Sequence, residues 1–204
     1  MEDSIQRNEL VNLFPTPVCV HDFDVNVFKG YKGEILKTYQ DICTDESDSF
    51  ITTDDGSDCN EQKTAIGFNI FNRQDLRTLI EHYFIPEILL DYCVSLSIKL
   101  PTQLRFSKIC KLKKGEKKSF KDLGSVLSLV FAVHCDQREQ IDIINPAFYF
   151  QSSKMIPEKI NGANAQIIGF PLDGKAYIFP SSTNYDISAK HEDMIFVQMG
   201  FMYD

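Results

Sequence analysis

The chain has 204 residues, of which 43% are hydrophobic and 25% charged, so we expect one globular domain spanning residues 1–204. Its formal net charge is −8 at pH 7. Proteins that bind nucleic acids gain affinity from cationic contacts to phosphates, so this charge argues against direct nucleic-acid binding.

Neither a membrane span nor a secretory signal peptide is predicted. No apolar run reaches the roughly 18 residues that cross a bilayer, and the first ten residues, MEDSIQRNEL, are polar and acidic. The six cysteines are scattered without a CxxC pair. This pattern favours free buried thiols over disulfides or a zinc site.

The first half of the chain, residues 25–100, is predicted to be helical, after a short strand over 12–20. Pro15 and Pro17 confine that strand to a sheet edge or an extended arm. Residues 28–43 carry apolar side chains at near-helical spacing and predict an amphipathic helix. Residues 72–98 predict a second helix, kinked or divided at Pro86 and packed across one face of a sheet.

An acidic stretch, residues 41–61, separates these two helices and is predicted to be a loop because it is rich in Ser, Thr, Asp and Gly. Its carboxylates fit no EF-hand spacing, so a solvated loop is favoured over a calcium site. A contact surface for a basic partner is compatible with either. The candidate contact residues are Asp45, Glu46, Asp48, Asp54 and Asp55.

The second half, residues 101–204, is predicted to hold about seven short strands. Residues 125–133, SVLSLVFAV, indicate a fully buried strand, and the stretches 141–150, 161–170 and 193–202 indicate others. The stretch 174–187, GKAYIFPSSTNYDI, predicts a hairpin that begins at an Asp-Gly turn. Helices followed by strands favour an α+β fold whose strands form a sandwich or barrel.

A basic hairpin tip stands out on this acidic chain. From Gln103 on, Leu104, Phe106, Ile109 and Leu112 indicate a strand or strand pair that leads into KLKKGEKKSFKDLG, with Gly115 at the turn. A solvated turn and a docking patch for an acidic partner are both open, since clustered cations attract such a partner at long range. The lysines concerned are Lys111, Lys113, Lys114, Lys117, Lys118 and Lys121.

Several stretches of the chain resemble a phage-borne family of 2-oxoglutarate/Fe(II) oxygenases. Leu13–Pro17 reads LFPTP, as that family opens, and GKAYIFPSS matches its strand ending in Phe-Pro-Ser. The KKGE turn, LGSVLSLVFAV and NPAF occur between them in the family's order. The resemblance implies a double-stranded β-helix, or jelly-roll, core with the N-terminal helices packed on one sheet.

The same resemblance locates the family's metal ligands in this sequence. Its His-x-His or His-x-Asp motif falls on Phe120-Lys121-Asp122, and its distal histidine falls near Tyr185. The family's late basic residue, which binds 2-oxoglutarate, has no counterpart after Lys190. Asp122 alone could ligate iron, so we expect no cofactor and no catalysis.

A rearranged site is the alternative. His134-Cys135-Asp136 is itself a His-x-Asp motif, and His191 follows it in an acceptable ligand order. These three residues would then bind Fe(II), with 2-oxoglutarate as cosubstrate.

The sequence therefore leaves three functions open. The preferred one is a non-catalytic β-helix module that binds other proteins, in its most concrete form a neck, tail or baseplate component of a tailed-phage virion. Its location would be the virion or the host cytoplasm. The alternative is an active oxygenase with the rearranged site. The third is a jelly roll that binds a small ligand near Tyr177 and Tyr185.

Overall fold

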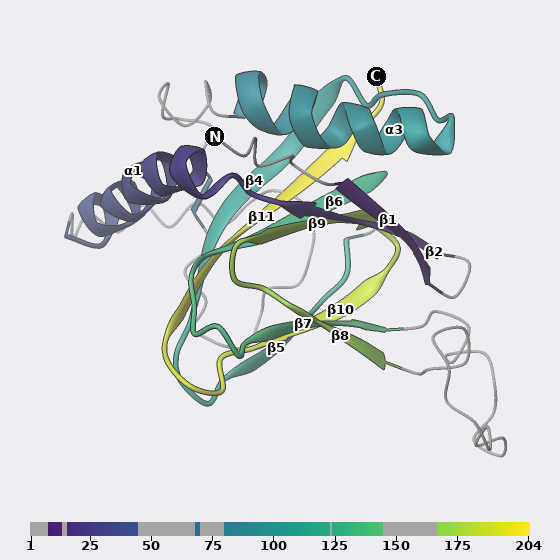
Figure 1. Ribbon diagram of the computed structural model, residues 1–204. Helices are drawn as coiled ribbons and strands as arrows, with labels where there is room; N and C mark the ends of the chain where they lie inside the picture. The colour runs from purple at the N-terminus through teal and green to yellow at the C-terminus, as the bar shows by residue number, and fades with distance from the viewer. Residues whose placement is uncertain (1–7, 14–15, 45–67, 70–79, 123, 145–166) are drawn as a thin grey trace, which may run out of the picture.

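A computed structural model of the chain describes residues 8–13, 16–44, 68–69, 80–122, 124–144 and 167–204, and its strands form two sheets (Figure 1). The larger sheet has the strand order β1-β2-β9-β6-β11-β4-β3, and the smaller has the order β5-β10-β7-β8. Neighbouring strands are antiparallel throughout. The strands are β1 Asn8–Leu13, β2 Thr16–Asp22, β3 Phe68–Asn69, β4 Gln103–Leu112, β5 Lys117–Phe120, β6 Leu127–His134, β7 Gln140–Ile144, β8 Ile167–Pro171, β9 Lys175–Pro180, β10 Asn184–Ser188 and β11 Met194–Met202.

The predicted two-sheet jelly roll is confirmed over the described residues. Strands β4, β6, β9 and β11 lie in the larger sheet, whereas β5, β7, β8 and β10 make up the smaller one. Strand β6 is buried on both faces, as its unbroken apolar run predicted, because the smaller sheet covers one face and helices cover the other. The predicted strands at 141–150 and 161–170 lie partly outside the described residues.

Both predicted hairpins are wrong, although their turns are correctly placed. Gly115 and Gly174 adopt positive φ values of 89° and 69°, as tight turns require. The lysine-rich turn, however, joins β4 of the larger sheet to β5 of the smaller one, and β9 and β10 also lie in different sheets. A turn signal marks where a strand ends and does not say which sheet the next strand joins.

The N-terminal stretch 12–20, expected as one edge strand, belongs to two strands. Strand β1 forms the edge of the larger sheet and pairs with β2, with Asn12 opposite Pro17. Strand β2 is then bound on its other side by β9. The predicted edge position is therefore wrong for Pro17, which lies in the inner strand β2 and is tolerated there because pairing with β9 begins only at Cys19.

Helix α1, Val25–Thr44, begins three residues earlier than predicted. Asp24 explains the earlier start, because its carboxylate accepts a hydrogen bond from the backbone N–H of Asn26 at 2.8 Å and so caps the first turn. The second helix is described from Ile80 and runs through Pro86 as wide π-helical turns, η2 Ile80–Leu89. It continues as α3 Leu90–Leu96. Proline has no N–H to donate, and the wider turns accommodate the missing hydrogen bond. The helix is therefore not interrupted at Pro86.

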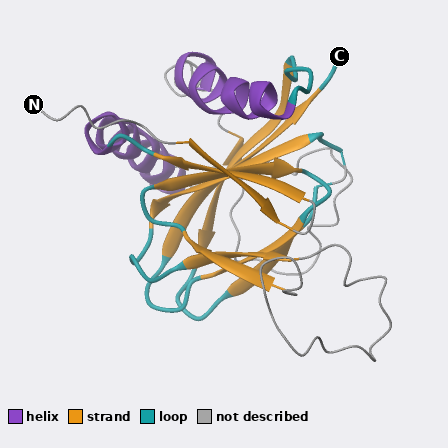
Figure 2. Cartoon of the chain, turned by 45° about the vertical axis from the view of Figure 1, so that its right-hand side comes forward, coloured by secondary structure: helices purple, strands orange, loops and turns teal. Residues whose placement is uncertain are grey.

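Two apolar cores lie on either side of the larger sheet. Figure 2 shows the helices on one side of the strands. One core holds residues of α1, η2 and α3 against β6, β9 and β11. Its centre is Phe131 of β6, whose ring lies 5.9 Å from Phe28 of α1 and 4.8 Å from Phe84 of η2, measured between centroids. The other core lies between the two sheets and is lined mainly by Ile, Val, Phe and Tyr. None of the described helices is long and apolar enough to cross a membrane.

Candidate functional site

Two aromatic rings occupy the end of the jelly roll where β5 ends and β10 begins. Phe120 and Tyr185 lie directly opposite each other on these paired strands. Their rings stack with centroids 5.2 Å apart and planes at 16°. Phe179 meets Tyr185 edge-on at 5.1 Å, and Phe196 meets Phe120 edge-on at 5.6 Å. This end of the interior is therefore filled by packed aromatic side chains.

Tyr185 is buried and neutral. Its side chain is 1% exposed, and its hydroxyl has no hydrogen-bond partner. Burial raises the pKa of Tyr185 well above the ordinary 10.0, and the nearby Cys110 and Asp122 raise it further. A neutral phenol is a poor ligand for a divalent metal, because binding requires loss of its proton.

Asp122 follows β5 and is tied to the loop that leads into β6. Its Oδ1 accepts hydrogen bonds from Arg105 Nη1 at 2.9 Å, from the Gly124 N–H at 2.9 Å and from the Ser125 N–H at 3.3 Å. The ion pair with Arg105 of β4 is partly shielded from solvent, since the Asp122 side chain is 7% exposed and that of Arg105 is 26% exposed. One carboxylate oxygen thus holds a strand and a loop together.

Replacing Asp122 with alanine should destabilise the fold by about 2–4 kcal/mol, because Arg105 and two backbone N–H groups would lose their common acceptor. Asp122→Asn should cost less, since the amide oxygen still accepts the backbone N–H bonds. Urea unfolding measures both. Lys121→Ala, at the exposed neighbouring position, is the control. An Asp122→Ala loss no larger than that of Lys121→Ala would contradict this role.

A group of polar atoms without partners lies beside Asp122, between the sheets. The Asp122 Oδ2 and the hydroxyls of Ser125, Ser128 and Tyr185 are buried and make no hydrogen bond. Gly200 of β11 leaves space for them. A Cβ atom there would lie 2.9 Å from Asp122 Oδ2 and would collide with the Ser125 hydroxyl and the Phe106 ring. Glycine is therefore required at this point of closest approach.

His134, Asp136 and His191, the residues of the rearranged metal site, lie at the opposite end of the jelly roll. His134 is the last residue of β6, Asp136 lies in the β6–β7 turn and His191 in the β10–β11 turn, and each has another partner. His134 faces Glu192 at 3.8 Å, Asp136 pairs with Arg138 at 2.8 Å, and His191 Nδ1 lies 3.1 Å from Glu139. Across the described residues, no three His, Cys, Asp or Glu side chains form a group that could hold a metal ion.

Glu139 is a fully buried carboxylate that links the turns at this opposite end of the jelly roll. Its Oε1 accepts the His191 backbone N–H at 2.6 Å, its backbone oxygen accepts the Leu172 N–H at 3.0 Å, and its Oε2 has no partner. Its side chain is 0% exposed. Glu139 therefore joins the three turns between β6 and β7, β8 and β9, and β10 and β11.

Glu139→Ala should lower the free energy of unfolding by about 2–3 kcal/mol, because the His191 N–H would lose its acceptor in a site closed to water. Glu192→Gln provides the control. Its carboxylate is 44% exposed beside His134, so its loss should cost less than about 1 kcal/mol. Thermal or urea unfolding of the two variants should separate them clearly. Equal losses of unfolding free energy in the two variants would mean that Glu139 does not link these turns.

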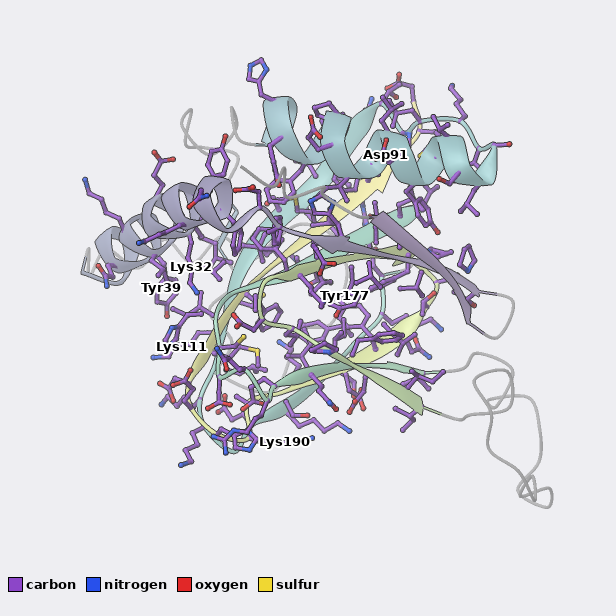
Figure 3. All side chains as sticks on the ribbon, in the orientation of Figure 1. Lys32, Tyr39, Asp91, Lys111, Tyr177 and Lys190 are labelled. Atoms are coloured by element: carbon purple, nitrogen blue, oxygen red, sulfur yellow. The ribbon has the colours of Figure 1, made fainter. Side chains whose placement is uncertain are left out.

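The six lysines of the basic cluster lie around the β4–β5 turn and along β5. Figure 3 labels Lys111 at the same end of the molecule as Lys190. Lys111 pairs with Asp193 at 3.1 Å and Lys117 with Asp186 at 2.6 Å, so part of the positive charge is neutralised within the chain. Strand β5 is an edge strand, and lysines on edge strands also prevent pairing with other chains. The acidic candidates 45–55 lie outside the described residues.

No protein-family model matches the sequence, and no curated protein matches it. Solved structures do match. The alpha-ketoglutarate-dependent epimerase SnoN of nogalamycin biosynthesis aligns with a TM-score of 0.59, 12% identity, 91% of this chain and 78% of its own. The carbocyclase SnoK of the same biosynthesis aligns with a TM-score of 0.59, 11% identity, 91% of this chain and 79% of its own. The fold is that of 2-oxoglutarate-dependent non-heme iron enzymes.

The residues at the expected ligand positions do not fit an iron ion. Phe120 has no donor atom, Tyr185 is a buried neutral phenol, and Asp122 uses Oδ1 for Arg105 and two N–H groups. A single remaining carboxylate oxygen cannot reproduce the two imidazoles and one carboxylate that hold Fe(II) in oxygenases. No reaction step through iron follows from this arrangement.

The sequence alone did not indicate that cationic side chains lie at this end of the jelly roll. Arg105 and Lys108 both come from β4, whereas the resemblance directs attention to the last strand. Lys108 lies opposite Gln198 of β11, and its Nζ is 4.9 Å from the centre of the Phe106 ring. Lys108 and Phe106 share the strand face that carries Cys110 and Leu112. Only the strand register, which the sequence does not provide, places Lys108 on that face.

Proposed function

We propose that this chain is a non-catalytic protein with the oxygenase fold, which acts by binding another protein. The observation that carries the proposal is the stacked pair Phe120 and Tyr185 at the positions expected for the two histidine ligands. A packed aromatic pair stabilises the fold, whereas an open metal site needs exposed donor atoms. The fold thus retains its stability without the chemistry.

The basic cluster supports an acidic protein partner. Lys113 and Lys114 project at the turn, where their backbone N–H groups are held by Glu116 and Asp193. A rigid turn presents cations at fixed positions, which favours specific docking over diffuse attraction. The sequence resemblance to a phage-borne family supports a tailed-phage virion, at its neck, tail or baseplate, as the assembly concerned.

Affinity capture from lysates of phage-infected host cells, followed by mass spectrometry, tests this function. We expect a virion structural protein to be captured by the unmodified chain and lost with Lys113→Glu/Lys114→Glu. The control is Lys29→Glu/Lys37→Glu, which makes the same charge change at exposed positions of α1. Equal capture by both double variants, or no virion protein captured by any form, would contradict the proposal.

A small-ligand site is the second candidate, favoured by the unpartnered polar atoms beside Gly200. Buried hydroxyls and carboxylates are nearly always hydrogen-bonded, and the Ser125 hydroxyl and Asp122 Oδ2, which both lie close to Gly200, call for a common partner. Native mass spectrometry of the purified protein would show a bound polar molecule. Tyr185→Phe, which removes only the hydroxyl, should reduce its occupancy. Identical mass with and without denaturation would exclude this function.

A further inference from the structure

A stripe of apolar side chains runs along the outer face of the helix formed by η2 and α3. Figure 1 shows this helix on the outside of the larger sheet. Four large hydrophobic side chains are exposed among the described residues, and three of them are Leu90, Val94 and Ile98, at 42%, 68% and 39%. They follow one another in steps of four, which is the spacing of one ridge on a helix. We call these three residues the apolar stripe.

The packing of the chain on itself does not account for the apolar stripe. The opposite face of the same helix, with Ile88, Leu89, Tyr92 and Cys93, is buried in the core that also contains residues of the larger sheet. A helix on the surface of a globular protein normally turns charged and polar side chains towards solvent. Exposed apolar side chains that lie next to one another instead indicate contact with another molecule.

The turn after α3 fixes the last member of the stripe. Ser97 adopts the left-handed conformation with φ 54°, and its N–H donates to the Val94 carbonyl at 3.1 Å. The N–H of Ile98 donates to the Cys93 carbonyl at 3.0 Å. These two bonds cap the helix and hold Ile98 at its end. The stripe is therefore presented on a backbone of defined shape.

Charged side chains at the two ends of the stripe indicate what covers it. Glu87 and Asp91 are exposed in its first half, whereas Lys99 is exposed just beyond its last residue. The Lys99 Nζ lies 5.7 Å from the centre of the Tyr203 ring, and the Tyr203 hydroxyl donates to the Lys99 carbonyl at 2.9 Å. The stripe thus has an acidic end and a basic end. Such a surface is complementary in charge to a copy of itself that runs in the opposite direction.

We propose that the apolar stripe binds the same stripe of a second copy of this chain, with the two helices antiparallel about a two-fold axis at Val94. Leu90 and Ile98 each lie four residues from Val94 in the sequence, so the axis brings Leu90 of each copy opposite Ile98 of the other. The same axis brings Glu87 towards Lys99. A two-fold interface requires a self-complementary patch of this kind, and ridges with a spacing of four residues pack into each other's grooves.

This dimer is independent of the proposed function. Figure 3 shows Asp91 of α3 well apart from Lys111 of the basic cluster. Contact through the stripe therefore leaves the basic cluster of each copy open to an acidic partner. The dimer would present that cluster twice, which strengthens binding to a partner that carries two acidic sites.

Sedimentation velocity of the full chain over about 1–500 µM tests the association. We expect a dimer that dissociates in the micromolar range, because the stripe is small for a protein interface. Val94→Glu puts two like charges on the axis and should weaken the dimer at least about tenfold. Ile167→Glu is the matched control, since it makes the same change at the fourth exposed hydrophobic side chain, 46% exposed on β8, and should leave the dimer unchanged.

Charge reversal provides a second readout that a loss of folding could not imitate. Glu87→Lys should weaken the dimer by about threefold, and Lys99→Glu added to it should restore the original affinity. Failure of this double variant to recover would overturn the antiparallel arrangement. A dimer that Val94→Glu leaves intact would overturn the interface. So would an unmodified chain that stays monomeric at every concentration, whether or not the stripe then binds lipid vesicles.

Discussion

The double variant Phe120→His/Tyr185→His should bind Co(II) or Fe(II) where the unmodified chain does not. The two positions face each other across β5 and β10, and the nearby Asp122 has one carboxylate oxygen without a partner. Two imidazoles and that carboxylate would complete the donor set of a non-heme iron site. We expect visible d–d absorption bands of bound Co(II) and an affinity at least about tenfold above that of the unmodified chain.

Asp122→Asn, added to the double variant, is the control for this gain. It removes the third ligand and should return the affinity towards the unmodified level, while the two histidines remain. Near-ultraviolet circular dichroism reports whether each variant keeps its aromatic packing. A folded double variant without Co(II) bands would mean that positions 120 and 185 are not the ligand positions of the fold.

Phe131→Ala should give the largest loss of stability among single core substitutions, about 3–5 kcal/mol. Phe131 is 0% exposed, and the rings of Phe23, Phe28 and Phe84 surround it. Its removal would leave a cavity where α1, η2 and the larger sheet meet, and rigid rings cannot close that cavity. Urea unfolding measures the loss.

Phe131→Leu serves as the graded comparison, since it keeps most of the apolar volume and should cost well under half as much. A Phe131→Ala loss below about 1 kcal/mol would mean that the helices do not depend on this contact. Such a result would also remove the physical reason for the double-sided burial of β6.

The two-sheet fold could be predicted from the sequence, whereas the loss of the metal ligands stays a prediction from the resemblance. The apolar run 125–133 indicates a strand buried on both faces, and β6 is such a strand. The resemblance to an oxygenase family places Phe120 and Tyr185 at ligand positions, and strand register puts them opposite each other. In both cases the sequence signal is local or comes from a known pattern.

Long-range strand register could not be predicted. The lysine-rich turn was expected to form a hairpin, but β4 pairs with β11 and β5 pairs with β10. Arg105 reaches Asp122 from β4, where the β4–β11 register shifts next to Gly200. Asp142 and Asp186 become neighbours only because β7 pairs with β10. No short sequence pattern encodes such pairings, which depend on how the whole chain folds.

The most direct test of the central claim is an anaerobic titration of the purified, unmodified protein with Fe(II) and 2-oxoglutarate. The visible charge-transfer band of the ternary complex reports binding of both. We expect no band, because Phe120 and Tyr185 occupy the positions expected for the histidine ligands. A band that appears with stoichiometric Fe(II) and 2-oxoglutarate would contradict it and would show an active oxygenase site.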